Sequence, residues 1–271
     1  MQPFASWLRA GSFADGGRGT RRPYLFDVLR GVERWLLPPA CLLCNEPVPD
    51  REGDALICDL CRMRWRAVPH PVCERCGQPS QKGLECRLCA EWPVGLARAR
   101  SAVWLDGSAR AAVHRLKYEG WSRAAEAMAE AMRQLEPLTR QVSLVPIPLG
   151  GHRLRDRGYN QSERIAAALG SRVNLSVRCD LLRRVRETRT QTALTPEARH
   201  ANVAGAFRAG PVKGLELVLV DDVFTTGATL AAAAAALVGA GAARVEAVTF
   251  ARAVTELEMG GFGAGLATRD S

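Results

Sequence analysis

The chain has 271 residues, of which 47% are apolar and 24% are charged. This mixture is typical of a folded protein and excludes wholesale disorder, a collagen helix and a continuous coiled coil, while the length fits one large domain or two modest ones. Lysine and arginine number 37 against 28 aspartate and glutamate, a formal charge of +9. The balance favours a polyanionic partner such as a phosphate or a nucleic acid, although an arginine-rich genome bias produces the same composition.

The N-terminal segment shows no export signal. Residues 1–22 have no apolar period, and we expect a mobile arm there, followed by a short amphipathic helix over Tyr24–Leu37. A signal peptide needs a basic start and a continuous apolar stretch of about 7 to 15 residues, which this arm lacks. The longest apolar run, Leu230–Ala243, is shorter than the roughly 18 to 20 residues that span a bilayer. We therefore expect reduced thiols and no membrane insertion.

Eight of the nine cysteines form four C-x-x-C pairs, which are Cys41 and Cys44, Cys58 and Cys61, Cys73 and Cys76, and Cys86 and Cys89. One C-x-x-C turn brings two thiolates to an ion at about 2.3 Å, and a second turn completes a closed tetrahedral site. The spacing therefore predicts two structural zinc ions in a module with too little core to fold without metal. The favoured arrangement has two neighbouring C-x-x-C pairs bind each ion. A cross-braced pairing and an iron–sulfur cluster are the alternatives. The ninth cysteine, Cys179, is expected in the core.

Beyond the cysteine pairs, short apolar runs alternate with helical periods. Strands are expected at 97–105, 142–147, 215–220 and 244–250, and helices at 108–118, 122–135, 162–169 and 228–238. Such alternation predicts an α/β domain with a mostly parallel sheet that is covered on both faces. The expected organisation is an arm and helix at 1–36, a double zinc ribbon at 37–92, the α/β domain at 93–254 and a loose tail at 255–271.

The run from Leu217 to Thr229 carries the clearest chemistry. An apolar strand ends in two adjacent carboxylates, Asp221 and Asp222, and a short hydroxyl-rich loop then opens a helix. At the carboxyl ends of parallel strands, helix N-termini present unpaired N–H groups to a ligand. We expect the acid pair to accept hydrogen bonds from vicinal sugar hydroxyls, and the loop to wrap a phosphate. The loop residues are Thr225, Thr226, Gly227, Ala228 and Thr229. A ribose 5-phosphate site is predicted, and a solvated, Asp-rich helix cap is the alternative.

This run resembles the phosphoribosyl pyrophosphate (PRPP) signature of type I phosphoribosyltransferases. With the cysteine pairs in front, further segments make residues 37–251 similar to the ComF family of competence-associated proteins. These segments are Leu116–Gly120, Val145–Pro148, Arg157–Glu163, Arg189–Leu194 and Ala206–Phe207. The resemblance implies a type I phosphoribosyltransferase-like parallel sheet flanked by helices, preceded by a small zinc-ribbon module. It also implies a cytoplasmic protein, two structural Zn²⁺ ions, Mg²⁺ bound with PRPP, and a link to uptake of single-stranded DNA in natural transformation.

The resemblance also assigns roles to other residues. The loop Leu149, Gly150 and Gly151, with Arg153, would hold the pyrophosphate. The segment 183–199 would be a loop that closes over the site, where Arg189 or Arg199 neutralises the leaving group, unless these arginines only form a solvated face. The chemistry would be displacement at the ribose C1 carbon, with Asp221 and Asp222 as the catalytic pair. The acceptor base is not indicated, and its hood is expected within 98–119.

Three functions compete at this point. The preferred one is a PRPP-binding phosphoribosyltransferase-like protein that acts in DNA uptake, with PRPP or a related nucleotide as its ligand. The alternative is a non-catalytic adaptor that handles single-stranded DNA and meets DNA-uptake proteins, using its zinc ribbon and basic surface. In that case the tryptophans at 65, 92, 104 and 121 are candidates for stacking on bases. A purely structural partner-binding protein ranks third.

Overall fold

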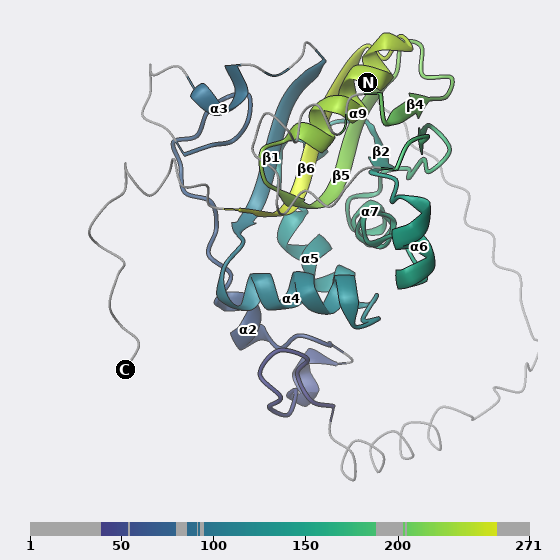
Figure 1. Cartoon of the computed structure of the whole chain (residues 1–271). Helices are drawn as coiled ribbons and strands as arrows, with labels where there is room; N and C mark the ends of the chain where they lie inside the picture. The colour runs from purple at the N-terminus through teal and green to yellow at the C-terminus, as the bar shows by residue number, and fades with distance from the viewer. Residues whose placement is uncertain are drawn as a thin grey trace, which may run out of the picture. The chain divides into compact units, whose positions relative to one another are not determined.

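The computed structural model describes residues 39–53, 55–79, 86–90, 92, 95–187, 203 and 205–253 (Figure 1). The expected N-terminal arm and helix, the expected tail, and the loop arginines Arg189 and Arg199 lie outside these residues.

Four parallel strands form the central sheet, in the order β1-β6-β5-β2. They are β1 (Leu96–Trp104), β2 (Ser143–Pro146), β5 (Glu216–Phe224) and β6 (Arg244–Arg252). The central strands β5 and β6 are apolar along most of their length because parallel sheets are buried on both faces. The expected α/β fold with a parallel sheet is therefore confirmed.

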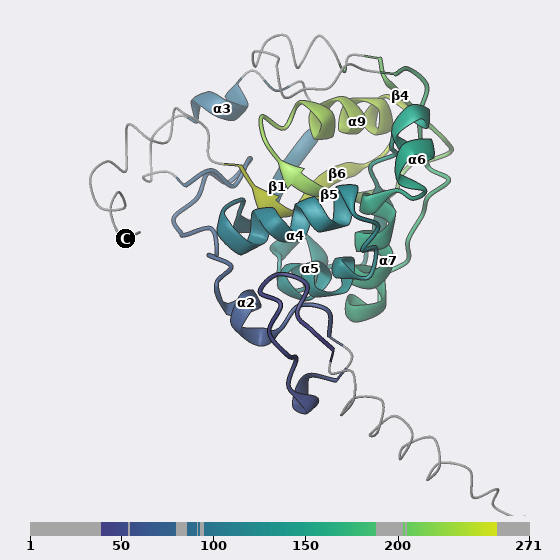
Figure 2. The ribbon, with the colours of Figure 1, turned by 60° about the horizontal axis from the view of Figure 1, so that its bottom comes forward.

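Different helices bury the two faces of the sheet. Val218 and Val220 of β5 belong to one apolar cluster, and Leu217 and Leu219 to the other, because successive side chains of a strand point to opposite faces. One face, here called the α5 face, is covered by α4 (Gly107–Tyr118), α5 (Ala124–Met132) and α7 (Gln161–Val173). The opposite α9 face is covered by α9 (Ala228–Gly239), as Figure 2 shows.

The cysteine segments pack on opposite faces of this sheet. Around η1 (Asp50–Glu52) and α2 (Asp59–Met63), Cys41, Cys58 and Cys61 join the apolar cluster of the α5 face. Near α3 (Arg87–Ala90), Cys76 and Cys89 join the cluster of the α9 face. The described residues from Ala40 onward form one compact unit, so a domain boundary at residue 92 stays a prediction.

Several local elements differ from the expectation. A helix not expected from the sequence, α6 (Gly151–Arg157), follows β2 and ends at Gly158. The segment from residue 183, expected as a mobile loop, begins as β3 (Leu182–Arg184), which pairs antiparallel with β4 (Phe207–Ala209). The short helix η2 (Glu136–Thr139) precedes β2. Cys179, expected in the core, is exposed. Among the helices that the structure describes, none is both long and apolar enough to cross a membrane.

Candidate functional site

Two adjacent carboxylates lie near the carboxyl end of β5. The strand extends to Phe224, so it includes the acid pair that the sequence placed just after it. Asp222 is buried and Asp221 is half-buried. Burial, and after it the charge of Asp222, raise the pKa of Asp221 to about 7. Two carboxylates so close together and so poorly hydrated favour a shared proton or ligands that donate hydrogen bonds.

A lysine that the sequence analysis did not assign neutralises this pair. The Nζ atom of Lys117 lies 2.5 Å from Oδ2 of Asp222, and the two side chains are 22% and 4% exposed. Burial works against the charge of Lys117, but the attraction of Asp222 outweighs it and raises the pKa of the lysine. Lys117 therefore holds a positive charge beside the acid pair at neutral pH.

Lys117 is held in place by contacts between two segments of the chain. The residue before it, Leu116, accepts a hydrogen bond at its carbonyl from the hydroxyl of Tyr159. The residue after it, Tyr118, has the guanidinium of Arg157 4.9 Å from its ring centroid. The end of α4 is thus docked on the segment that leads into α7. Both segments carry the family resemblance, which is the signal that could have found Lys117.

The first turn of α7 supplies a second polar contact. The hydroxyl of Ser162 donates to Oδ1 of Asp221 over 2.7 Å. Asn160 caps the helix, because its Oδ1 accepts from the N–H of Ser162 over 3.1 Å, while its Nδ2 donates to the carbonyl of Ile147 over 3.0 Å. Caps of this kind contribute about 1 kcal/mol to stability. Asn160 therefore fixes Ser162 between the end of β2 and the acid pair.

The predicted phosphate loop connects β5 to α9 immediately after the acid pair. Gly227 has φ +79° and caps the helix, a left-handed conformation that glycine adopts without strain. The Oγ1 atom of Thr226 accepts from the N–H of Ala228 over 3.4 Å. The first N–H groups of a helix have no partner within the helix and carry the positive end of its dipole. The structure thus brings the residues 225–229 together with Asp221 and Asp222.

The predicted pyrophosphate loop lies at the end of β2, next to β5 in the sheet. Its residues Leu149 and Gly150 are followed by α6, which begins at Gly151. A carboxylate unforeseen from the sequence lies against this loop: Glu187 accepts from the N–H of His152 over 3.2 Å. Burial opposes its charge, but the N–H groups of His152 and Gly151 lower the pKa of Glu187. Glu187 therefore lies where an anionic group of a ligand is predicted.

Other predicted residues have different outcomes. Arg153 lies on α6 and is half-buried. Burial, and after it the positive charge of Arg153, lower the pKa of Arg184 of β3. The range 98–119 comprises most of β1 and all of α4, and Arg98 forms ion pairs with Glu136 and Glu246. Its role as a hood for the acceptor base stays a prediction.

Two of the four tryptophans proposed for base stacking are unsuited to it, and a third, Trp104, is half-buried. Trp65 and Trp92 are buried at 9% and 4% exposure, so neither ring is available to a nucleic acid. Trp121 is 43% exposed, so its ring is accessible to a base.

Two groups of four cysteines have the geometry of metal sites. Cys41, Cys44, Cys58 and Cys61 form the first group, and Cys73, Cys76, Cys86 and Cys89 form the second. Within each group all Sγ atoms lie within 4.8 Å of one another, and Cys73 and Cys89 are 3.7 Å apart. Four thiolates at Zn–S distances of about 2.3 Å would be about 3.8 Å apart, so the groups fit tetrahedral zinc. The neighbouring pairs are the ones that come together, as favoured from the spacing.

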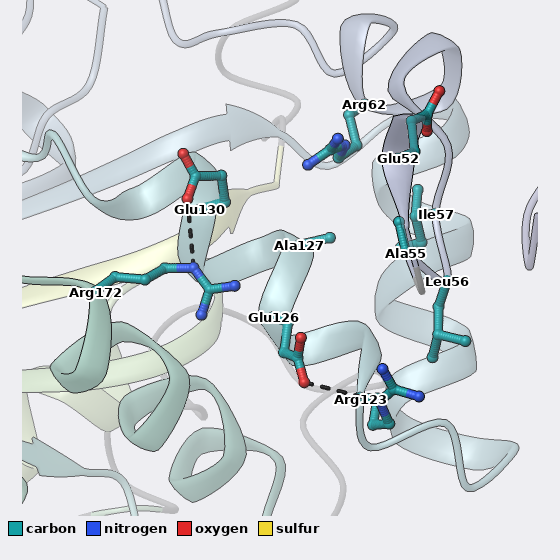
Figure 3. Close-up of a pocket in the computed structure, with 10 residues that line it drawn as sticks. All are labelled: Glu52, Ala55, Leu56, Ile57, Arg62, Arg123, Glu126, Ala127, Glu130 and Arg172. Carbon is teal, nitrogen blue, oxygen red and sulfur yellow. Dashed lines mark ion pairs between the residues drawn. The ribbon is translucent and has the colours of Figure 1, made fainter. Parts of the chain in front are cut away.

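The described residues also line a hollow of 390 Å³ away from the acid pair (Figure 3). It lies between the segment that carries α2 and the helices α5 and α7. Three of its side chains are arginines and three are glutamates, and four of these six form the ion pairs Arg172–Glu130 and Arg123–Glu126. Because its charges are balanced, this hollow is a poor site for a polyanion.

Comparison with known proteins matches both parts of the chain. A double zinc ribbon domain matches residues 32–90, and a phosphoribosyl transferase domain matches residues 157–259. The DNA utilization protein YhgH of Salmonella typhi is 34% identical over 221 residues, covering 78% of this chain and 95% of its own length. The competence protein ComFC of Bacillus subtilis is 26% identical over 232 residues, covering 78% and 94%. The chain belongs to the ComF family. Its two cysteine groups are accordingly structural zinc-binding sites.

Among solved structures, a purine phosphoribosyltransferase from Pyrococcus horikoshii Ot3 covers 55% of this ComF-family chain and 95% of its own length. The identity is 16% and the TM-score 0.28.

Proposed function

We propose that this ComF-family chain binds PRPP, together with Mg²⁺, at the carboxyl ends of β2 and β5. The observation that carries the proposal is the convergence of the acid pair with a helix-opening loop. In this arrangement the 5-phosphate lies on the N–H groups and hydroxyls of residues 225–229. The ribose hydroxyls donate to Asp221 and Asp222, and the pyrophosphate lies on the loop 149–151.

The contacts of the acid pair support a ligand with both hydroxyl groups and negative charge. A sugar hydroxyl can replace the hydroxyl of Ser162 as a donor to Asp221, whose pKa is raised chiefly by burial. Lys117 is close enough to neutralise charge that the ligand brings next to Asp222. Arg153 lies on α6, the helix that the predicted pyrophosphate loop opens, and arginine binds polyanions such as pyrophosphate well.

The reaction that such a site supports is displacement at the ribose C1 carbon. A nitrogen of the acceptor base forms a bond to C1 while the bond from C1 to the pyrophosphate oxygen breaks, and pyrophosphate leaves with both bonding electrons. Positioning and charge neutralisation supply most of the catalysis in such a step.

We further propose that the chain acts in the cytoplasm in the use of imported DNA. This rests on the names of its relatives, a DNA utilization protein and a competence protein, and on its formal charge of +9. The competing view is an adaptor that handles single-stranded DNA without turnover. Of the four candidate tryptophans, all of which the structure describes, only Trp121 is exposed, and it gives that view a narrow stacking surface.

Calorimetric titration with PRPP and Mg²⁺ tests the proposed function. The wild type is compared with the double variant Asp221→Asn, Asp222→Asn, which loses the negative charge of both acceptors. Asp180→Asn serves as the matched control because Asp180 is an exposed carboxylate bound to Arg178. We expect the wild type and the control to bind PRPP and the double variant to lose binding. Equal affinity in all three proteins would contradict the assigned site.

A further inference from the structure

The side chain of Trp92 packs directly against the predicted phosphate loop. Its Nε1 donates to the carbonyl of Thr226 over 3.3 Å. Its ring lies 5.8 Å, between centroids, from the ring of Phe224, which ends β5. The backbone of Gly227 runs so close to the indole that a Cβ atom at this position would overlap its Cζ2 atom. One buried side chain thus contacts the residue that precedes the loop, a carbonyl within the loop and the helix cap.

Trp92 is in turn held by the second cysteine group. The backbone N–H of Trp92 donates to the carbonyl of Cys89 over 3.2 Å. Arg75, which lies between Cys73 and Cys76 in the sequence, donates to the carbonyls of Cys89 and Trp92 over 2.9 Å and 3.3 Å. The guanidinium of Arg75 also lies 5.6 Å from the centroid of the indole. The indole is therefore part of the framework that the four thiolates organise.

A second connection runs from the same cysteine group to the end of β5. Arg252, the last residue of β6, is 1% exposed and donates to the carbonyl of Cys76 over 2.9 Å. Its guanidinium lies 4.3 Å from the ring centroid of Phe224. A buried guanidinium over an aromatic face is a favourable contact. Both connections reach the loop from the α9 face.

We propose that Trp92 is a positioning residue for the phosphate loop, through which the second cysteine group sets the geometry of the PRPP site. The role in ligand binding rests on the proposed function, whereas the role in ordering the loop does not. Zinc in the second group and PRPP in the site are then coupled, because metal bound there fixes the segment that fixes the loop. The second zinc ion acts on PRPP affinity without contacting the ligand.

The first cysteine group offers a matched control. Trp65 is also buried, adjoins its own cysteine group in the apolar cluster of the α5 face, and packs edge-on against Phe250 of β6 with 4.8 Å between ring centroids. Replacement of either tryptophan by phenylalanine removes a similar amount of buried surface beside a zinc site. Only Trp92 donates to the phosphate loop.

Hydrogen exchange measures the loop without any ligand. The full-length protein is compared as wild type, Trp92→Phe, Trp92→Leu and Trp65→Phe, with zinc content determined for each. The reporters are the amides of Ala228, which donates to Thr226, and Ala231, which donates to the Gly227 carbonyl over 2.8 Å. We expect exchange about tenfold faster in Trp92→Leu, less so in Trp92→Phe, and unchanged in Trp65→Phe, with two zinc ions in every protein. Unchanged exchange in both Trp92 variants, with two zinc ions bound to each, overturns the proposal.

Calorimetry with PRPP and Mg²⁺ on the same proteins measures the consequence for binding. We expect about tenfold weaker affinity in Trp92→Leu and less than a twofold change in Trp65→Phe. If the wild type binds PRPP and both tryptophan sites have equal effects, the coupling is wrong. If the wild type does not bind PRPP, the proposed function fails, and the exchange comparison still decides whether Trp92 orders the loop.

Discussion

The raised pKa of Asp221 predicts a stability effect that can be measured without knowing the ligand. Asp221→Asn removes the ionisable group but keeps the shape of the side chain, and an amide oxygen still accepts from the hydroxyl of Ser162. Burial and the charge of Asp222 raise the pKa of Asp221 from 3.8 to about 7 in the folded protein. The variant should therefore unfold less readily than the wild type at pH 8.

The magnitude follows from the difference between the two pKa values. One pKa unit corresponds to about 1.4 kcal/mol, so ionised Asp221 costs the folded state about 4 kcal/mol. Between the two pKa values the folded state binds the proton and the unfolded state does not, so wild-type stability falls as the pH rises. The effect amounts to about 2.5 kcal/mol between pH 5 and pH 7.5, and it levels off above about pH 8.

Urea unfolding of the wild type and Asp221→Asn at half-unit steps from pH 5 to 8.5 gives this difference directly. Asp180→Asn is the control, because the guanidinium of Arg178 lowers the pKa of Asp180 to about 2. Its titration lies below the pH range, so its difference from wild type should be constant. The reasoning is refuted if the advantage of Asp221→Asn does not change with pH or shrinks as the pH rises.

Three further predictions concern the same site. Lys117→Met leaves the buried carboxylate of Asp222 without its counter-ion. Breaking a buried pair costs about 3–5 kcal/mol, and because the lysine is partly exposed we expect a loss of about 2–3 kcal/mol in the free energy of unfolding, measured with urea at pH 8. An unchanged urea midpoint would contradict the role of this ion pair. Glu187→Gln weakens the group that competes for the N–H groups opening α6, and calorimetry should show PRPP binding severalfold more tightly, whereas weaker binding would make Glu187 a ligand contact. Gly227→Ala places a methyl group at φ +79° and against Trp92. The left-handed conformation then costs about 1–2 kcal/mol, which should lower the thermal unfolding midpoint, and PRPP binding should be lost. An unchanged midpoint together with unchanged PRPP binding would contradict the loop geometry.

Features that depend on contiguous residues were predictable from the sequence. The acid pair and the loop 225–229 lie on one strand–turn–helix, so their order along the chain already places them together. The four C-x-x-C pairs are equally local, and the structure assembles neighbouring pairs as favoured. The parallel sheet followed from the alternation of apolar runs and helical periods.

Features that depend on tertiary contacts were not predictable. Lys117 reaches Asp222 across more than a hundred positions of sequence, and apart from the family resemblance of its segment, nothing in its neighbourhood marks it as a partner of the acid pair. Trp92 was a candidate for base stacking because composition alone does not distinguish a buried indole from an exposed one. Glu187 follows an arginine-rich strand, and its contact with His152 arises only from the way β3 approaches α6.

The most direct test of the account is a crystal structure of the zinc-loaded protein with PRPP and Mg²⁺. The account predicts the 5-phosphate on the N–H groups of residues 225–229, the ribose hydroxyls against Asp221 and Asp222, and Glu187 displaced from the N–H of His152 by the pyrophosphate. PRPP bound elsewhere, or with its ribose turned away from the acid pair, would contradict it.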